Sequence, residues 1–271
     1  MITASIVTYN TAPGDLSRLI QCVLKSPIKK IFIIDHSDNE NLKRTIPNSE
    51  RVEYIHTVNR GYGAGHNVGL RKSIDLGAKY HVVLNHDVYW KDNVIEELVS
   101  YMDNHLECGL IMPNILYPDG RIQYLCKLVP TPVDLILRRF IPIKQWQAKH
   151  SVNYEMHWTG YNQIMEVPIL SGCFMLLRCS TIKQTRGFDE RYFLYAEDVD
   201  LCRRIGEVSQ TIFFPKVSVY HEYAKGSYSS SKMRNLHIHS IVKYFNKWGW
   251  FFDKRRSRRN RECITKIKDK H

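Results

Sequence analysis

The sequence lacks the features that would place the chain in a membrane or in an oxidising compartment. Its longest nearly apolar stretch, residues 167–177, is interrupted by Pro168, Ser171 and Gly172, and it is shorter than the roughly 20 apolar residues that cross a bilayer. No basic segment precedes the apolar residues at the N-terminus, so we expect no signal peptide. The seven cysteines are odd in number and scattered without a C-x-x-C pair, which argues against a disulfide framework and a structural zinc site. We therefore expect a cytoplasmic protein.

Internal repeats, low-complexity segments and a linker between independent domains are also missing. A length of 271 residues fits one large domain, or a domain with a sizeable appendage, with an ample core. The 44% hydrophobic and 24% charged fractions are ordinary for a globular protein. The net charge of +12 is uneven, because residues 243–271 carry eleven Lys or Arg against three acids, or +8 of the total. Such a basic segment indicates a polyanionic partner, either nucleic acid or an anionic membrane.

Short apolar runs alternate with amphipathic segments in the first part of the chain. The runs that predict buried strands are residues 4–8, 30–35 and 52–56, together with the stretch 80–87, whose apolar part is residues 82–84. The segments whose spacing predicts helices are residues 15–24, 66–76 and 94–102. This alternation predicts an α/β fold with a mostly parallel sheet flanked by helices.

The alternation fades beyond Pro113, and residues 121–160 have the irregular apolar spacing of an insertion over one end of the sheet. The later segments predict a strand within 167–178, a helix at 196–205, two short strands within 211–220 and a final helix at about 232–248.

Three predicted strands end in polar side chains. These are Thr8, Tyr9 and Asn10 after the first strand, Asp35, His36 and Ser37 after the second, and Asn85, His86 and Asp87 after the fourth. Parallel strands bring such ends to one edge of the sheet, where α/β proteins bind ligands. A carboxylate there suits a hard divalent cation, which can bind a diphosphate. One tripeptide alone is equally well a polar turn, but three together favour a site.

A glycine-rich segment, residues 59–67, precedes the second predicted helix. It contains no Walker pattern, and its spacing misses the dinucleotide fingerprint. Its glycines allow close approach of the backbone to a ligand, and the helix start supplies N–H groups for an anion. The alternative is a tight loop that needs glycine for its backbone angles.

A dense acidic and aromatic cluster lies at residues 187–204. Acids at the start of the predicted helix suit the helix dipole, which is the structural interpretation of Glu197, Asp198 and Asp200. However, Glu197 and Asp198 directly follow an apolar and aromatic run, where a carboxylate could act as a general base. His221, after a strand, could bind a metal, although a lone histidine is more often structural.

Taken in order, these motifs resemble the family 2 glycosyltransferases, and most of all their rhamnosyltransferase-like branch. The resemblance covers about residues 3–250 and includes the segments 8–10, 35–37, 59–67, 85–87, 171–178 and 187–201. It implies the GT-A fold in one domain, 1–250, with a nucleotide-binding half, 1–112, and an acceptor-binding half, 113–250. A basic C-terminal tail, 251–271, would follow. It also implies sugar transfer with inversion and a divalent metal, Mn²⁺ or Mg²⁺.

The resemblance assigns roles to individual residues. The donor-binding residues would be Thr8, Tyr9, Asn10, Asp35, Ser37, Asn59, Gly61, Asn67, Asn85, His86 and Asp87. Asp87 and His221 would bind the metal, and Asp198 would be the base, with Glu197 beside it. The branch often has Asn-Pro-Asp where this chain has Asn85-His86-Asp87. Because the first residue of this tripeptide is an asparagine and not an acid, the site offers few charged ligands to the metal.

The expected reaction moves a sugar, with rhamnose as a candidate, from a dTDP- or UDP-sugar to a hydroxyl of a glycan. In this family the glycan is often linked to a polyprenyl diphosphate, in the synthesis of bacterial surface polysaccharide. The aromatic and basic residues 247–259 predict peripheral attachment to the inner face of the cell membrane.

Three alternatives remain at this level. A nucleic-acid-binding protein would use the basic tail but leaves the polar strand ends unexplained. A sugar-1-phosphate nucleotidyltransferase would need an early glycine-rich loop and lysine, which the sequence lacks. A catalytically inactive sugar-binding protein is distinguished only by an assay.

Overall fold

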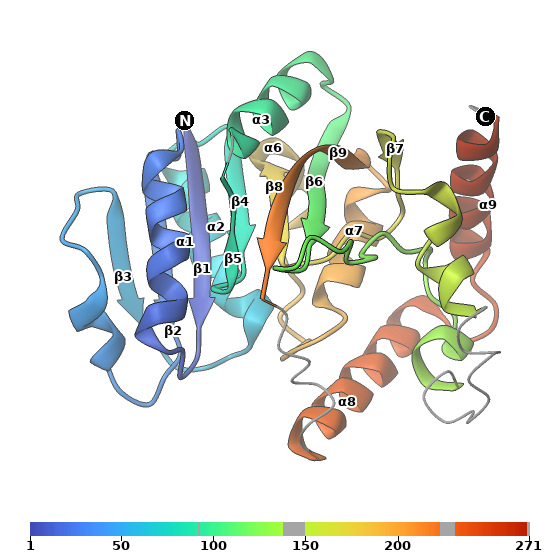
Figure 1. Ribbon diagram of the computed structural model, residues 1–271. Coiled ribbons are helices and arrows are strands. Elements are labelled where there is room, and N and C mark those ends of the chain that lie inside the picture. Colours follow the sequence, from blue (N-terminus) through green and yellow to red (C-terminus); the bar gives the residue numbers. More distant parts are fainter. Residues whose placement is uncertain (92, 138–149, 223–230, 270–271) are drawn as a thin grey trace.

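A computed structural model describes residues 1–91, 93–137, 150–222 and 231–269. The fold is built on a nine-stranded sheet with helices packed against it (Figure 1). The strand order is β3-β2-β1-β4-β8-β6-β9-β5, and β7 pairs with β9 off this path. The strands are β1 (Ile2–Thr8), β2 (Lys30–Asp35), β3 (Val52–His56), β4 (Tyr80–Leu84), β5 (Val88–Tyr89), β6 (Cys108–Leu116), β7 (Met165–Glu166), β8 (Phe174–Arg178) and β9 (Gln210–His221).

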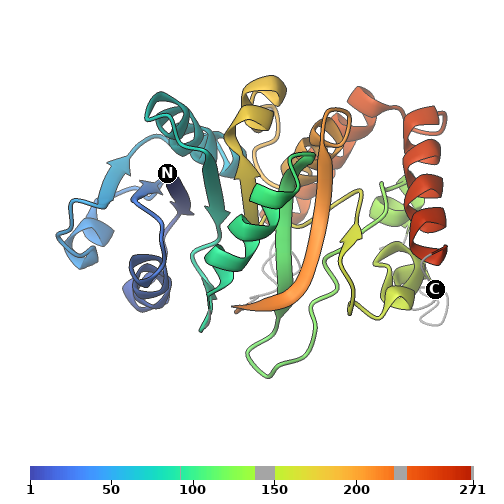
Figure 2. The same cartoon turned by 90° about the horizontal axis from the view of Figure 1, so that it is seen from above.

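Helices cover both faces of this sheet. They are α1 (Pro13–Lys25), α2 (Tyr62–Asp75), α3 (Val94–Asn104), α6 (Cys179–Thr185), α7 (Glu197–Ile205), α8 (Ser231–Trp248) and α9 (Lys254–Lys268), with short turns η1 (Asn41–Thr45), η2 (Val133–Leu137) and η3 (His157–Thr159). Seen from above, α1 and α3 lie on one face, and α2, α6 and α7 lie on the other (Figure 2). Among the described residues, no helix combines the length and apolar character needed to cross a bilayer.

The α/β class agrees with the prediction, and the parallel pairing is concentrated at one side of the sheet. β3, β2, β1 and β4 pair in parallel, whereas β8 pairs antiparallel with both β4 and β6. β6 and β9 are parallel again, and the short strands β5 and β7 are antiparallel to β9. The sheet is therefore mixed beyond β4. A parallel connection needs a crossover segment, and the regular helical crossovers end after β6.

The predicted elements of the first half are found with small shifts of their ends. Strands 30–35 and 52–56 match their predicted bounds, and β4 covers the first part of the predicted stretch 80–87, including its apolar run. The prediction of two short strands within 211–220 is wrong, because β9 is one strand whose register against β6 shifts near Pro113. The second helix begins at Tyr62 rather than at residue 66, so most of the glycine-rich segment is the first turn of α2.

The basic C-terminal segment forms the ordered helix α9, which packs on the body of the protein. Cys263 and Ile267 are buried in the main hydrophobic core. Arg259 donates hydrogen bonds to the carbonyl of Gly206 after α7 and to Thr211 Oγ1 on β9. Much of this segment is thus part of the folded structure.

A buried ion pair anchors the start of α9. Asp253 accepts a hydrogen bond from the backbone N–H of Arg256 and so caps the helix. Its Oδ2 also lies 2.8 Å from Nη1 of Arg203 on α7, and both side chains are only 4% exposed. Removing one partner of such a pair leaves an uncompensated buried charge.

We therefore expect Asp253→Ala to lower the free energy of unfolding by about 3–5 kcal/mol, through loss of the ion pair and the cap. Glu262 on the same helix is the matched control, because it is solvent-exposed, and its replacement by alanine should cost no more than about 0.5 kcal/mol. Urea unfolding followed by circular dichroism measures both. Equal stability of the two variants would mean that α9 is not held to the body as described.

Candidate functional site

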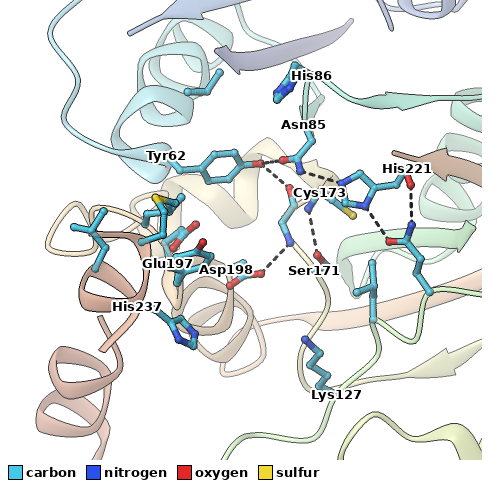
Figure 3. Close-up of a pocket in the computed structure, with 18 of the residues that line it drawn as sticks. Tyr62, Asn85, His86, Lys127, Ser171, Cys173, Glu197, Asp198, His221 and His237 are labelled. Carbon is cyan, nitrogen blue, oxygen red and sulfur yellow. Dashed lines mark hydrogen bonds between the residues drawn. The ribbon is translucent and has the colours of Figure 1, made fainter. Parts of the chain in front are cut away.

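The carboxyl ends of β1 and β4 open into a cleft of about 1330 Å³ (Figure 3). Its lining comes from both the N-terminal and the C-terminal half of the chain. Residues 7–9 and 85–86 line it together with residues from the segments 117–127, 171–173 and 193–198. The predicted site residues that line it are Thr8, Tyr9, Asn59, Gly61, Asn85, His86, Glu197, Asp198 and His221. The remaining predicted residues, Asn10, Asp35, Ser37, Asn67 and Asp87, are not among the lining residues.

Asp35 lies beneath the cleft and supports the segments that form it. Its buried carboxylate accepts hydrogen bonds from Thr8 Oγ1 (3.1 Å), from the N–H and Oγ of Ser37 (3.0 and 2.6 Å), and from Tyr54 OH (2.8 Å). Burial opposes the charge, but the hydrogen bonds from Ser37, Tyr54 and Thr8 lower the pKa of Asp35 below its usual value. Ser37 Oγ in turn accepts from the backbone N–H of Asn10 (2.8 Å). This group fixes the ends of β1 and β2 relative to each other.

Asn67 fastens α2 to the loop before α7. Its Oδ1 accepts from the N–H of Phe188 (2.8 Å), and its Nδ2 donates to the Phe188 carbonyl and to Glu190 Oε1 (both 2.9 Å). With both ends of the amide engaged, Asn67 acts in this structure as a positioning residue.

The start of α2 joins the two walls of the cleft. Gly61 has φ of +101°, and a Cβ there would lie 2.1 Å from the carbonyl oxygen of Phe193, so only glycine fits. The next N–H, that of Tyr62, donates to this same carbonyl (2.9 Å). The Tyr62 hydroxyl contacts both Asn85 Oδ1 (2.9 Å) and the carbonyl of Gly172 (2.8 Å). The hydroxyl of Tyr62 thus links the end of β4 to the segment that precedes β8.

Asp87 and His221 form the candidate metal centre. Asp87 Oδ1 is buried without a hydrogen bond from the described residues and lies 3.3 Å from His221 Nε2. Burial raises the pKa of Asp87, but the neighbouring His221 outweighs this effect and the pKa is lowered. Gln123 orients the imidazole, because its Oε1 lies 2.9 Å from Nδ1 and its Nε2 donates to the His221 carbonyl (2.8 Å). In the tautomer that carries its proton on Nδ1, facing Gln123, the Nε2 lone pair would be available to a cation beside Asp87.

This donor set fits a divalent cation that is shared with a ligand. The described residues contain no group of three or more His, Cys, Asp or Glu side chains that could hold a metal by themselves. One carboxylate and one imidazole suit Mn²⁺ or Mg²⁺ only if the remaining positions are taken by water and by phosphate oxygens. The assignment of Asp87 and His221 as metal ligands stays a prediction.

The two adjacent carboxylates at the start of α7 differ in environment. Asp198 lines the cleft and accepts hydrogen bonds from the N–H of Gly172 (3.0 Å) and of Val199 (2.8 Å). Glu197 is 5% exposed. Burial, and then the charge of Asp198, raise the pKa of Glu197, so it holds its proton to higher pH than an ordinary glutamate. Of the two residues, Asp198 is the one that is partly exposed to the cleft and whose carboxylate is oriented by two backbone N–H groups.

Several lining residues have no assigned role in the sequence-based prediction. They are Tyr62, Gln123, Lys127, Ser171, Cys173 and His237, with others from the segment 117–125. Tyr62 and Cys173 fall within the segments 59–67 and 171–178, which carry the family resemblance, so the sequence offered a signal for them. Gln123 and Lys127 lie in the irregular insertion, where no periodicity indicates the direction of a side chain.

Two comparisons place the chain among known sequences. Residues 3–184 match the family described as glycosyl transferase family 2. The chain is 27% identical over 241 residues to N-acetylglucosaminyl-diphospho-decaprenol L-rhamnosyltransferase of Mycobacterium tuberculosis, a match that covers 80% of this chain and 75% of the relative. It is 25% identical over 227 residues to rhamnosyltransferase WbbL of Escherichia coli, covering 79% and 81%.

Solved structures share the fold at low sequence identity. GalNAc-T7, solved with UDP, GalNAc and Mn²⁺, gives a TM-score of 0.63 at 15% identity over 89% of this chain. The mannosyltransferase PcManGT of Pyrobaculum calidifontis, solved with GDP-Man and Mn²⁺, gives 0.58 at 14% identity over 90%. The chain spans only 47% and 64% of these two longer proteins. The predicted GT-A fold is thus confirmed, and the chain belongs to glycosyl transferase family 2.

Proposed function

We propose that this protein transfers a sugar, with inversion, from a nucleoside-diphosphate donor to a hydroxyl group of a glycan, with Asp198 as the base. The observation that carries this proposal is the setting of Asp198. Its carboxylate lies in the cleft, held by two backbone N–H groups, and faces the strand ends at Asn85 and His86 across the open space (Figure 3). A base with this fixed orientation can accept a proton from an acceptor hydroxyl that lies between the walls.

The bond changes then balance in a single displacement. The acceptor oxygen gives its proton to Asp198 and bonds to the anomeric carbon. The bond from that carbon to the nucleoside diphosphate breaks on the opposite face, and the diphosphate leaves with the electron pair. No covalent enzyme intermediate is required, and the configuration at the anomeric carbon is inverted.

Asp87 and His221 would hold Mn²⁺ or Mg²⁺ beside the donor diphosphate. The bound cation would supply charge neutralisation for the departing diphosphate. The chain itself contributes the orientation of the two ligands, through Gln123 on His221 and through the position of Asp87 directly after β4. Thr8, Tyr9 and Asn59 would border the nucleoside, since all three line the cleft.

The relatives suggest the finer identity of the substrates. We propose a dTDP- or UDP-sugar donor, with rhamnose as the candidate sugar, because two relatives are named as rhamnosyltransferases. We further propose an acceptor linked to a polyprenyl diphosphate, in surface polysaccharide synthesis, since one of these names contains a diphospho-decaprenol acceptor.

Such an acceptor would bring the protein to the cytoplasmic face of a membrane, and we propose that α9 and the turn before it make the contact. Phe251 and Phe252 in this turn are 77% and 98% exposed. The exposed basic side chains of α9, which begins two residues after Phe252, are Lys254, Arg255, Arg258, Arg261, Lys266 and Lys268. Aromatic rings and cations together suit an anionic lipid surface.

Asp198→Asn is expected to lower kcat by at least about 10²-fold while nucleotide-sugar affinity stays nearly unchanged, because only the proton acceptor is lost. Glu197→Gln is the comparison, and its effect should be smaller, since a buried Glu197 with a raised pKa already favours its neutral form. Steady-state transfer assays and calorimetry with the donor measure both. Full turnover by Asp198→Asn contradicts the assignment, and a large loss only in Glu197→Gln moves the role to that residue.

Asp87→Ala should weaken donor binding at least about tenfold in the presence of Mn²⁺ and have little effect in its absence, because the carboxylate acts through the cation. Gln123→Ala should weaken Mn²⁺ binding by about 10- to 100-fold, since the His221 ring loses its orienting partner. Calorimetry with and without EDTA tests both changes. The metal role fails if EDTA leaves the donor affinity of the unmodified protein unchanged.

The double change Phe251→Ser and Phe252→Ser is expected to reduce binding to vesicles that contain anionic lipid, with no loss of stability, because both rings are exposed. Val58 and Leu106, which are 77% and 74% exposed, provide matched control positions for serine. Vesicle co-sedimentation at rising salt separates the electrostatic contribution of the basic residues from the apolar contribution of the two rings. The electrostatic contribution should fall as salt screens the charges. Binding that the control pair reduces equally would place the membrane contact elsewhere.

A further inference from the structure

Lys127 lines the cleft close to the proposed base. It pairs with Ile169 through two backbone hydrogen bonds of 2.9 and 3.1 Å. Three residues after Ile169, the N–H of Gly172 donates to Asp198. Three residues of chain span at most about 10 Å, so Lys127 is anchored close to the proposed base. Figure 3 shows it on the side of Ser171 and Asp198 that lies away from Asn85 and His86.

The ammonium group of Lys127 has no counter-ion within the part of the chain that the structure describes. Its Nζ makes no ion pair or hydrogen bond there, although the residue is half-buried and lines the cleft. The acids on the same wall have other partners. Glu155 lies 3.2 Å from His157 Nε2, and Asp134 accepts two hydrogen bonds of 2.6 Å from Thr131.

Among the described Lys and Arg residues that line the cleft, Arg121 behaves differently. Its side chain is 79% exposed and is paired with Asp119 at 2.8 Å. A partly desolvated cation without a counter-ion, in a cleft, is the arrangement expected of a binding site for an anion. Lys127 is the residue of this wall that meets the description.

Apolar side chains line the cleft together with Lys127. Leu125 precedes it by two residues on the same segment, and Leu135 of η2 and Leu194 lie in the lining as well. Met233 and Leu236 of α8 add two further apolar groups. The cleft thus combines a lysine that makes no ion pair with the described residues and these five apolar side chains, here called the apolar wall, which matches a diphosphate joined to a hydrocarbon chain.

We propose that Lys127 binds the diphosphate of a lipid-linked acceptor, so that the first units of the hydrocarbon chain lie along the apolar wall. This inference rests on the proposed glycosyl transfer. The acceptor hydroxyl lies at Asp198, and the diphosphate on the far side of the same sugar lies at Lys127. The donor diphosphate lies instead beside Asp87 and His221, on the other side of the base.

Binding and transfer are measured separately, so that the two proposals fail in distinguishable ways. Calorimetry with farnesyl diphosphate tests the subsite without any need for transfer. Lys127→Ala should weaken this binding by about 10- to 100-fold, as expected for loss of a charge-assisted hydrogen bond, and Lys127→Arg should restore most of it. Arg121→Ala is the matched control and should change affinity by less than about threefold.

In transfer assays, Lys127→Ala should raise KM for a sugar linked to a short polyprenyl diphosphate and leave transfer to the corresponding uncharged alkyl glycoside unchanged. Equal losses on both acceptors would overturn the proposal in favour of a structural role. Weaker binding of UDP or dTDP by Lys127→Ala would show that the donor diphosphate is the ligand. Failure of the unmodified protein to bind farnesyl diphosphate overturns the subsite, whereas binding without transfer overturns only the proposed reaction.

Discussion

The contact between the backbone at Gly61 and the carbonyl of Phe193 determines how the two walls of the cleft meet. A side chain at residue 61 would occupy the position of that carbonyl oxygen, which lies 2.1 Å from where a Cβ would be. Since α2 can start at this point, Tyr62 reaches both Asn85 and Gly172. The N–H of Gly172 in turn holds Asp198. The geometry between the end of β4 and the proposed base therefore depends on one close approach of two backbones.

A buried polar network fixes α2 on the sheet beneath this contact. Ser5 Oγ lies 2.7 Å from both His66 Nδ1 and His81 Nε2, and His81 Nδ1 lies 2.6 Å from Ser73 Oγ. Burial lowers the pKa of His81 to about 3 and lowers that of His66 as well, so both rings are neutral and act as hydrogen-bonding groups. Because these hydrogen bonds between Ser5, Ser73 and the two imidazoles form in only one arrangement, the network favours one register of α2 against β1 and β4. The glycines of α2 that allow the close packing would not define this register alone.

The fold was more accessible from the sequence than the roles of the site residues. β2 and β3 were predicted to the residue and β4 within the stretch 80–87, because short runs rich in β-branched and aromatic residues indicate strands. The direction of the side chains after those strands does not follow from the pattern. Asp35 and Asn67 carry the right functional groups, but the structure uses them to hold neighbouring segments.

The opposite case is Gln123, which carries no sequence signal. Its partner His221 is 98 residues away, and the pairing arises only when the insertion folds against the end of β9. The same holds for Lys127, whose position next to Ile169 depends on an isolated bridge outside the regular strands. A ligand subsite built from such contacts is therefore invisible to a search for periodicity or motifs.

The net charge of the C-terminal segment is another property that the sequence gives only in part. A count of Lys and Arg does not say which of them pair within the protein and which are exposed. Arg256 is buried at the start of α9, Arg259 is directed at Gly206 and Thr211, and Lys247 on α8 pairs with Asp189 and Asp200 at 2.7 and 2.6 Å. These cations stabilise the protein itself and are not available to an outside surface.

Each basic residue beside an anionic leaflet contributes about 1 kcal/mol, so the attraction calculated from the full +8 of residues 243–271 is too large. In the proposed membrane attachment, the exposed Lys and Arg of α9 would still supply a long-range electrostatic attraction, which salt screens. The short-range part of an attachment then has to come from apolar area, and the described tail offers it in one place, at Phe251 and Phe252. An attachment of this kind would orient the molecule, because α9 is packed rigidly on the body, whereas a disordered basic arm would only tether it.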